Sequence, residues 1–348
     1  MMNDKIYFGW DIGGANTKLA ICNSKCEVIE FYFEVIPIWK STKPLEDFFH
    51  FVLNKFPSAN CLHLITFTAE SCDNFSSRSA GINYLINLCE KNLSGKIKYY
   101  SNSNSYIDFY QADKFPEQLY STNWMLTLNY IKRLNNINLI IDIGSTTTDF
   151  IYKGMNLGTN IDDFSRLKNK TLLYQGVVRT PLAMLADKVS YNNQDLPIIK
   201  EVYATTGDVF CILDDIDFSK LPYVGSDNLP FSKDNSNRRI LRSFGLDENY
   251  EDRSLVISIS KQLKQIILDN ILGYISHICK TIKSDLVISS IGEGRKLIQE
   301  VCYEKKINYE DLMKSNLMID GKHLNNVDQL SHFTSFLVIL NYFEKNNE

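Results

Sequence analysis

A short phrase occurs twice in this chain, and each copy follows an apolar run typical of a β-strand. The copies are Asp11-Ile-Gly-Gly-Ala-Asn-Thr-Lys18 and Asp142-Ile-Gly-Ser-Thr-Thr-Thr-Asp149, so their first aspartates lie 131 residues apart (142 − 11). A carboxylate at a strand end, followed by a glycine turn rich in hydroxyl and N–H groups, can bind phosphate beside a hydrated cation. Two copies predict a phosphorylated small molecule held from both sides, by a fold of two similar halves.

Each copy leads back into an extended segment rather than into a helix. Residues 19–22 and 28–36 follow the first copy as strand-like segments, and residues 148–152 follow the second. In dinucleotide-binding and Walker-type loops the glycines open a helix, so both of those interpretations fail on context. The two loops are therefore predicted to be turns between paired strands.

Helical and strand-like patterns alternate in the rest of the chain. Apolar residues at helical spacing predict helices at 44–56 and 77–90, with a buried strand at 63–68 between them. The second half repeats this alternation, and its predicted elements are a helix at 254–282, a strand at 285–289 and a helix at 327–344. Such alternation is typical of sheets with helices on their faces.

The length of 348 residues exceeds what one hydrophobic core usually supports. We therefore predict an α/β fold of two halves, each a mixed sheet flanked by helices. Residues 1–125 would form the half with the first loop. Residues 126–348 would form the half with the second loop, a glycine corner at Gly292 and Gly294, and an exposed excursion near 211–252, where Asp, Asn, Pro and Gly are frequent.

Charge and composition exclude several classes of binding partner. A net charge of −4, with Lys and Arg scattered among acids, gives no broad positive field, so nucleic acid is not an expected partner. No apolar run approaches the ~20 residues of a membrane span, and the N-terminus leads straight into a strand, so we expect a cytoplasmic protein without a membrane partner. The eight cysteines form no Cys-x-x-Cys pair and the five histidines show no zinc-ligand spacing. The oligomeric state stays open.

The paired loops and the late glycine corner resemble the superfamily of actin, sugar kinases and Hsp70-type ATPases, whose halves are ribonuclease-H-like. Within it the chain is similar to the hydantoinase A/oxoprolinase family, and more narrowly to proteins of methanopterin-linked one-carbon metabolism in archaea and methylotrophs. The blocks that carry the narrower likeness are 9–18, 66–73, Asn123-Trp124, 142–149, Asp162 with Arg166-Leu167, 174–181 and 204–208. The first loop departs from hydantoinase A, which usually has an acidic end there, because it ends in Lys18.

The resemblance implies a transferase of methanofuran biosynthesis. The assigned reaction joins γ-glutamyl-tyramine to an aminomethyl-furan-methyl diphosphate and releases diphosphate, with Mg²⁺ as cofactor. Two alternatives stay open. One is an ATP-dependent kinase or hydantoinase-type amide-ring hydrolase, in which Gly292 and Gly294 would approach adenosine. The other is a nucleotide-gated scaffold, against which the absence of an extra substrate-binding domain weighs.

The candidate site follows from the two loops and the blocks between them. Asp11, Asp142 and Asp149 are the predicted metal ligands. Lys18, Asp142, Glu70 and Arg179 are the predicted catalytic residues, with Glu70 or Asp73 as base and Arg179 as a fork for diphosphate or carboxylate. Trp124 would stack an aromatic ring or lie in the core. The predicted phosphate-binding residues are Gly13, Gly14, Ala15, Asn16, Thr17, Lys18, Gly144, Ser145, Thr146, Thr147 and Thr148.

Overall fold

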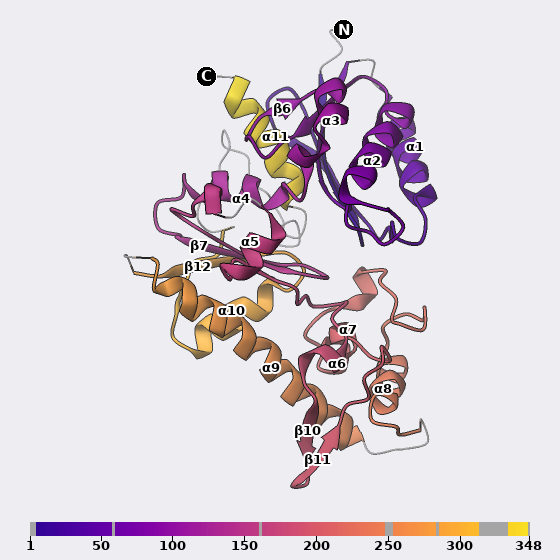
Figure 1. The fold of residues 1–348 in the computed structure, drawn as a ribbon, viewed down its shortest axis with the longest axis vertical. Helices are drawn as coiled ribbons and strands as arrows, with labels where there is room; N and C mark the ends of the chain where they lie inside the picture. The colour runs from indigo at the N-terminus through magenta and orange to yellow at the C-terminus, as the bar shows by residue number, and fades with distance from the viewer. Residues whose placement is uncertain are drawn as a thin grey trace. The chain divides into compact units, whose positions relative to one another are not determined.

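The computed structural model describes residues 5–57, 60–159, 162–247, 253–282, 285–312 and 333–346. The chain divides into two compact units (Figure 1). Residues of 1–137, 151–166 and 310–348 make up the first unit, and residues of 138–150 and 167–309 make up the second. Each unit contains one copy of the repeated phrase.

The first unit is built on a mixed sheet. Within the described residues it has six strands in the order β3-β2-β1-β4-β5-β6, and β1 lies antiparallel to β2 and parallel to β4. The strands are β1 (Ile6–Gly13), β2 (Thr17–Cys22), β3 (Val28–Glu34), β4 (Cys61–Thr68), β5 (Lys96–Tyr100) and β6 (Tyr106–Ile107). The hairpin of β1 and β2 confirms the predicted return of the first copy into a strand.

Helices cover both faces of this sheet. On one face Trp10 packs edge-on against Phe48 and Phe49 of α1, and a continuous apolar core extends from there to α2. On the other face α11 lies so close to β1 that a Cβ on Gly9 would come within 2.1 Å of the Ser335 carbonyl oxygen. The helices are α1 (Lys43–Lys55), α2 (Arg78–Asn92), α3 (Phe109–Lys114), η1 (Pro116–Leu119), α4 (Asn123–Ile131), η2 (Leu157–Thr159) and α11 (Phe333–Asn346), and α5 (Asp163–Lys168) lies where the chain passes between units.

The sheet of the second unit repeats the strand order of the first. Its order is β13-β12-β7-β8-β9, and β12 runs parallel to both β7 and β13. Counted along the chain within each sheet, both sheets therefore read third-second-first-fourth-fifth, and the first sheet adds β6 at one edge. The strands are β7 (Leu139–Ile143), β8 (Thr148–Tyr152), β9 (Leu172–Leu173), β12 (Val287–Ile291) and β13 (Asn308–Tyr309).

A long helix connects this sheet to a helical part of the same unit. In Figure 1, α9 runs from the hairpin of β10 and β11 towards the sheet, and α6, α7 and α8 pack beside it. Within residues 211–247, α8 buries Arg239, Ile240 and Leu241 against the rest of the unit, whereas most other residues of this stretch are half-buried or exposed. The elements are α6 (Leu182–Leu185), β10 (Lys188–Tyr191), β11 (Gln194–Pro197), α7 (Thr206–Ile212), η3 (Phe218–Lys220), α8 (Lys233–Arg242), α9 (Arg253–Cys279) and α10 (Arg295–Glu304).

The structure confirms the predicted α/β class with mixed sheets flanked by helices. The helices predicted at 44–56, 77–90 and 254–282 are α1, α2 and α9, with ends shifted by a few residues. The helix predicted at 327–344 is α11, and residues 327–332 lie outside the described part. None of the helices in the described residues combines the length and hydropathy that a membrane span requires.

Candidate active site

The first loop is a tight turn between β1 and β2. The Gly13 N–H donates to the Asn16 carbonyl oxygen at 3.0 Å, which closes the turn. The chain after β3 then passes along the loop, where the N–H groups of Ile36 and Ile38 donate to the carbonyl oxygens of Ala15 and Gly14 at 3.1 and 2.9 Å. The loop is therefore held by backbone hydrogen bonds on two sides, as a preorganised ligand loop requires.

Charged and hydroxyl side chains share one face of the sheet beside this loop. Asp11 lies opposite Lys18 on β2 and opposite Thr66 on β4. Because residues opposite one another across paired strands point to the same face, carboxylate, ammonium and hydroxyl form a row across three strands. Asp11 is only 5% exposed and Lys18 is half-buried, so their electrostatic interaction is screened less than at an open surface.

The remaining residues of the first loop are buried or packed against neighbouring side chains. Thr17 lies opposite Ile12, on the face that packs against α1 and α2, and it is fully buried. Its hydroxyl therefore points to the core face, opposite to the face of Asp11 and Lys18. Ala15 and Asn16 are also buried, and Gly14 lies against the Cys72 side chain, whose sulfur is 2.9 Å from where a Cβ would be.

Glu70 follows β4 and lies in a buried ion pair. Its Oε1 accepts from the Arg78 guanidinium at 2.7 Å and from the Ser121 hydroxyl at 2.8 Å. Its Oε2 is buried and has no hydrogen-bond partner among the described residues. Burial raises the pKa of the Glu70 carboxyl, and Arg78 opposes this rise. A buried carboxylate with a perturbed pKa beside a specific charge partner is typical of functional sites.

The predicted residues Asp73 and Trp124 are not part of the buried ion pair of Glu70. Asp73 is exposed, three residues beyond Glu70. Trp124 is 5% exposed, and the buried Arg166 guanidinium stacks on its ring at 4.3 Å from the ring centre. Of the two interpretations of Trp124, the structure favours the core, because a protein cation already covers one face of the ring.

The second loop has the same turn as the first. The Gly144 N–H donates to the Thr147 carbonyl oxygen at 2.9 Å, and both residues lie 131 positions after Gly13 and Asn16 (144 − 13 and 147 − 16). Ser145 is buried, Thr146 and Thr147 are half-buried, and Thr148 donates from its hydroxyl to the Gln175 carbonyl oxygen at 2.6 Å. The Thr148 hydroxyl thus has a structural partner.

Residues 176–179, here called the strap, hold the second loop from outside. The N–H groups of Val178 and Arg179 both donate to the Ser145 carbonyl oxygen, at 3.1 and 2.9 Å. A Cβ on Gly176 would lie 2.4 Å from the backbone of Ser145 and Thr146, so only glycine fits there. The exposed Arg179 side chain reaches the Thr146 hydroxyl at 3.5 Å, which places a guanidinium at the loop.

The glycine corner packs against the strand that precedes the second loop. Gly292 has φ +85°, and a Cβ there would lie 2.6 Å from Oδ1 of Asp142. Gly294 donates its N–H to the Ile143 carbonyl oxygen at 3.0 Å. Contacts within the second unit therefore account for both glycines. Asp142 is the penultimate residue of β7, beside this corner, and Asp149 is half-buried in β8, opposite Leu172.

Sequence reasoning missed one carboxylate of this region. Oε2 of Glu293 lies 3.5 Å from the position of a Cβ on Gly144, and Oε1 accepts from the Tyr223 hydroxyl at 3.3 Å. Glu293 stands between the two glycines of the corner, so its position in the sequence was visible. The approach of Tyr223, 70 residues earlier, was not.

The donor set fits a cation that completes its coordination with ligand oxygens. No group of three or more His, Cys, Asp or Glu side chains suited to a metal occurs in the described residues. Mg²⁺ is typically bound by one or two carboxylates plus water and substrate phosphates. Asp142 is a half-buried carboxylate of this kind, and its Oδ1 packs so closely against Gly292 that a Cβ there would lie 2.6 Å away.

The repeated strand order and the two loops define the class of α/β proteins with paired ribonuclease-H-like units, that of actin, Hsp70-type ATPases and sugar kinases. A solved structure of this fold is nucleotide-free acetone carboxylase, at TM-score 0.52 and 10% identity, covering 97% of this chain and 70% of that one. No protein-family model matches the chain.

Two curated archaeal proteins are similar in sequence, and both are named (4-{4-[2-(gamma-L-glutamylamino)ethyl]phenoxymethyl}furan-2-yl)methanamine synthase. The Methanocaldococcus jannaschii protein is 26% identical over 289 residues, covering 82% of this chain and 86% of the relative. The Methanococcus vannielii protein is 32% identical over 157 residues, covering 44% of this chain and 71% of the relative. The chain belongs to the family of these synthases.

Proposed function

We propose that this chain is a transferase of methanofuran biosynthesis that makes the aryl ether named in its two relatives. It joins the phenol oxygen of γ-glutamyl-tyramine to the furfuryl carbon of an aminomethyl-furan-methyl diphosphate. The observation that carries this proposal is the family membership, with 82% of the chain aligned to one synthase. The two glycine loops are a separate observation that agrees with it, because backbone N–H groups in such turns can bind the oxygens of a diphosphate.

The chemistry asks the protein to stabilise a leaving anion. The bond between the furfuryl carbon and the diphosphate oxygen breaks, and the electron pair leaves with the diphosphate. The phenol oxygen then bonds to that carbon and loses its proton. Within its own unit, Lys18 beside the first loop or Arg179 beside the second would bind phosphoryl oxygens, since charge-assisted hydrogen bonds are roughly twice as strong as neutral ones.

Glu70 is the proposed acceptor of the phenol proton. Its buried Oε2 has no partner among the described residues, and burial raises the pKa of its carboxyl. A carboxylate with a raised pKa is a stronger base than an exposed one, and the Arg78 guanidinium beside it favours the charged form that accepts a proton. Ser121 and Arg78 orient the carboxylate through Oε1.

Mg²⁺ is the proposed cofactor, with Asp142 as the first candidate ligand and Asp11 and Asp149 as further ones. When bound, it would neutralise charge on the diphosphate. The protein's own part is to hold the loops, the cations and the carboxylates in place.

Product analysis tests the proposal. The pure protein with Mg²⁺, γ-glutamyl-tyramine and the furfuryl diphosphate should release diphosphate only when the phenol is present. The same protein with ATP and a lactam or amide should release no phosphate. Phosphate release from ATP that depends on an amide substrate would reject the synthase and support the hydantoinase-type hydrolase instead.

A further inference from the structure

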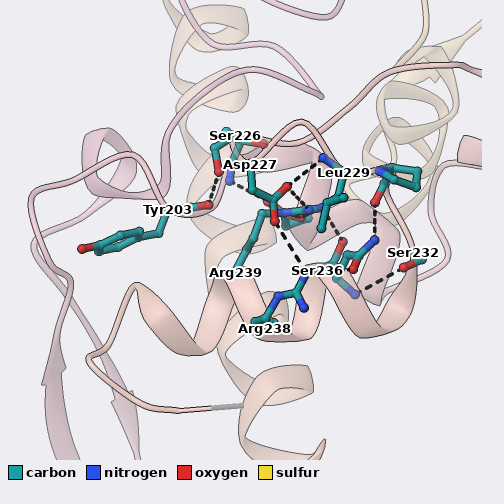
Figure 2. Close-up of polar contacts among 12 residues, drawn as sticks. Tyr203, Ser226, Asp227, Leu229, Ser232, Ser236, Arg238 and Arg239 are labelled. Atoms are coloured by element: carbon teal, nitrogen blue, oxygen red, sulfur yellow. Dashed lines mark hydrogen bonds and ion pairs between the residues drawn. The ribbon is translucent and has the colours of Figure 1, made fainter.

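The second unit contains a buried cluster of charges that is far in sequence from the second loop but connected to it by contacts. Arg239 of α8 is 1% exposed, and its Nε and Nη2 both lie within 2.8 Å of Oδ1 of the fully buried Asp208. Its Nη1 donates to Oδ1 of Asp227 at 2.8 Å (Figure 2). One guanidinium thus joins α7, α8 and the turn at 223–230.

The first connection runs through Asp208 to the strap. Oδ2 of Asp208 accepts from the Thr205 N–H at 2.9 Å and so fixes the start of α7. At this helix start the Gly207 N–H donates to the Val178 carbonyl oxygen at 3.0 Å. The Thr206 hydroxyl donates to the Gly176 carbonyl oxygen at 2.8 Å. The strap, held in this way, makes the hydrogen bonds to Ser145 described above.

The second connection runs through the turn at 223–230. A Cβ on Gly225 would lie 2.4 Å from Cζ of Arg239, so the turn rests directly on the guanidinium. Leu229 closes the turn by accepting from the Gly225 N–H at 2.8 Å. Tyr223, at the start of this turn, is 5% exposed and donates its hydroxyl to Glu293 beside Gly144.

We propose that Arg239 is a positioning residue for the second loop, because it fixes both the strap on one side and the Tyr223–Glu293 pair on the other. This inference rests on the proposed function, since it assigns the second loop to the diphosphate. Arg239 touches no reacting atom. A buried guanidinium suits this role, because its planar fork holds two carboxylates at once with little remaining freedom.

The test compares three variants with the wild-type protein. Arg239→Lys keeps the charge but cannot reach Asp208 and Asp227 together. Tyr223→Phe breaks only the second connection. Lys264→Gln is the matched control, because it breaks a partly buried ion pair with Asp215 in the same unit. The readouts are the Kd of inorganic diphosphate with Mg²⁺ by calorimetry, kcat and KM, and amide hydrogen exchange of residues 177–179 without ligand.

Arg239→Lys should raise the Kd of diphosphate about tenfold, since displaced catalytic groups lose such factors. It should also speed exchange at 177–179. Tyr223→Phe should raise the Kd less, and the double variant should show less than the sum of the two effects because they share one route. The control should change neither readout.

A folded Arg239→Lys protein with wild-type diphosphate affinity and exchange would overturn the inference. If that variant does not fold, Asp227→Asn and Tyr223→Phe decide, because wild-type affinity in both would equally overturn it. A wild-type protein that neither binds diphosphate nor releases it would reject the proposed function. The exchange of residues 177–179 is measured without ligand, so it tests the role of Arg239 even in that case.

Discussion

Gly176 offers the sharpest single-residue test of the second loop. Its φ lies outside the left-handed region, so alanine can adopt the same backbone conformation. The added Cβ would, however, lie 2.4 Å from the carbonyl carbon of Ser145 and 2.4 Å from the nitrogen of Thr146. Both are backbone atoms, which cannot rotate away as the end of a side chain could. Strap and loop must therefore separate in Gly176→Ala.

The size of the separation follows from the contact distances. Ordinary van der Waals contact begins at 3.4 Å, so the strap must move by roughly 1 Å relative to the loop. A displacement of about 1 Å at a catalytic site can reduce the rate about 100-fold. We therefore expect kcat/KM to fall by about that factor, equivalent to about 2.7 kcal/mol of transition-state stabilisation. Overpacking of this kind typically lowers the free energy of unfolding by about 1–3 kcal/mol.

The assay is diphosphate release at saturating γ-glutamyl-tyramine, well below the melting temperature of the variant. Gly273→Ala in α9 is the control, because nothing lies within 4 Å of its Cβ position. A helical Gly→Ala change of this kind should stabilise the protein by about 0.5–1 kcal/mol and leave kcat/KM unchanged. If Gly176→Ala folds and retains wild-type kcat/KM, the second loop takes no part in turnover and the assignment of the strap is wrong.

Three further predictions concern the first unit. Lys18→Met should reduce kcat/KM about 100-fold without changing the far-UV circular dichroism, because it removes a cation beside the loop; an unchanged rate removes Lys18 from the mechanism. A general base makes kcat rise with pH, and Glu70→Gln should abolish this rise. If the variant keeps the rise, another residue is the base. Burial lowers the pKa of His63 from 6.5 to about 4. The neutral form of His63 therefore contributes to the free energy of unfolding above pH 6.5, and this contribution, roughly 3 kcal/mol, is lost as the pH falls to about 4. Urea unfolding at several pH values should show this loss in the wild-type protein and not in His63→Phe.

Local patterns predicted those parts of the structure that depend on neighbours in sequence. The hairpin turns at Gly13 and Gly144 could be predicted, because glycine and the apolar runs around it are local signals. The strap could not, because its contact joins Gly176 to Ser145, and the decisive feature is the absence of one side chain. Glu293 was missed for the same reason, since its neighbour Tyr223 comes from a distant turn.

Burial also separated residues that look equivalent in the sequence. Thr17 and Lys18 are adjacent, yet strand alternation places Thr17 on the core face and Lys18 on the face of Asp11. Arg166 covers the ring of Trp124, a contact 42 residues apart that no spacing rule anticipates. Which residues bind ligand stays a prediction for all positions of the two loops.

The packing of α11 against Gly9 constrains how the protein is made. Strand β1 leaves the ribosome well before α11, because the helix that covers its second face is translated more than 300 residues later. Until then this face of β1, β2 and β4 is exposed to solvent or to chaperones, as in other proteins whose early segments wait for late partners. Loss of α11 by truncation should therefore damage the unit that contains β1, rather than the second unit, whose residues 167–309 precede α11 more closely in sequence.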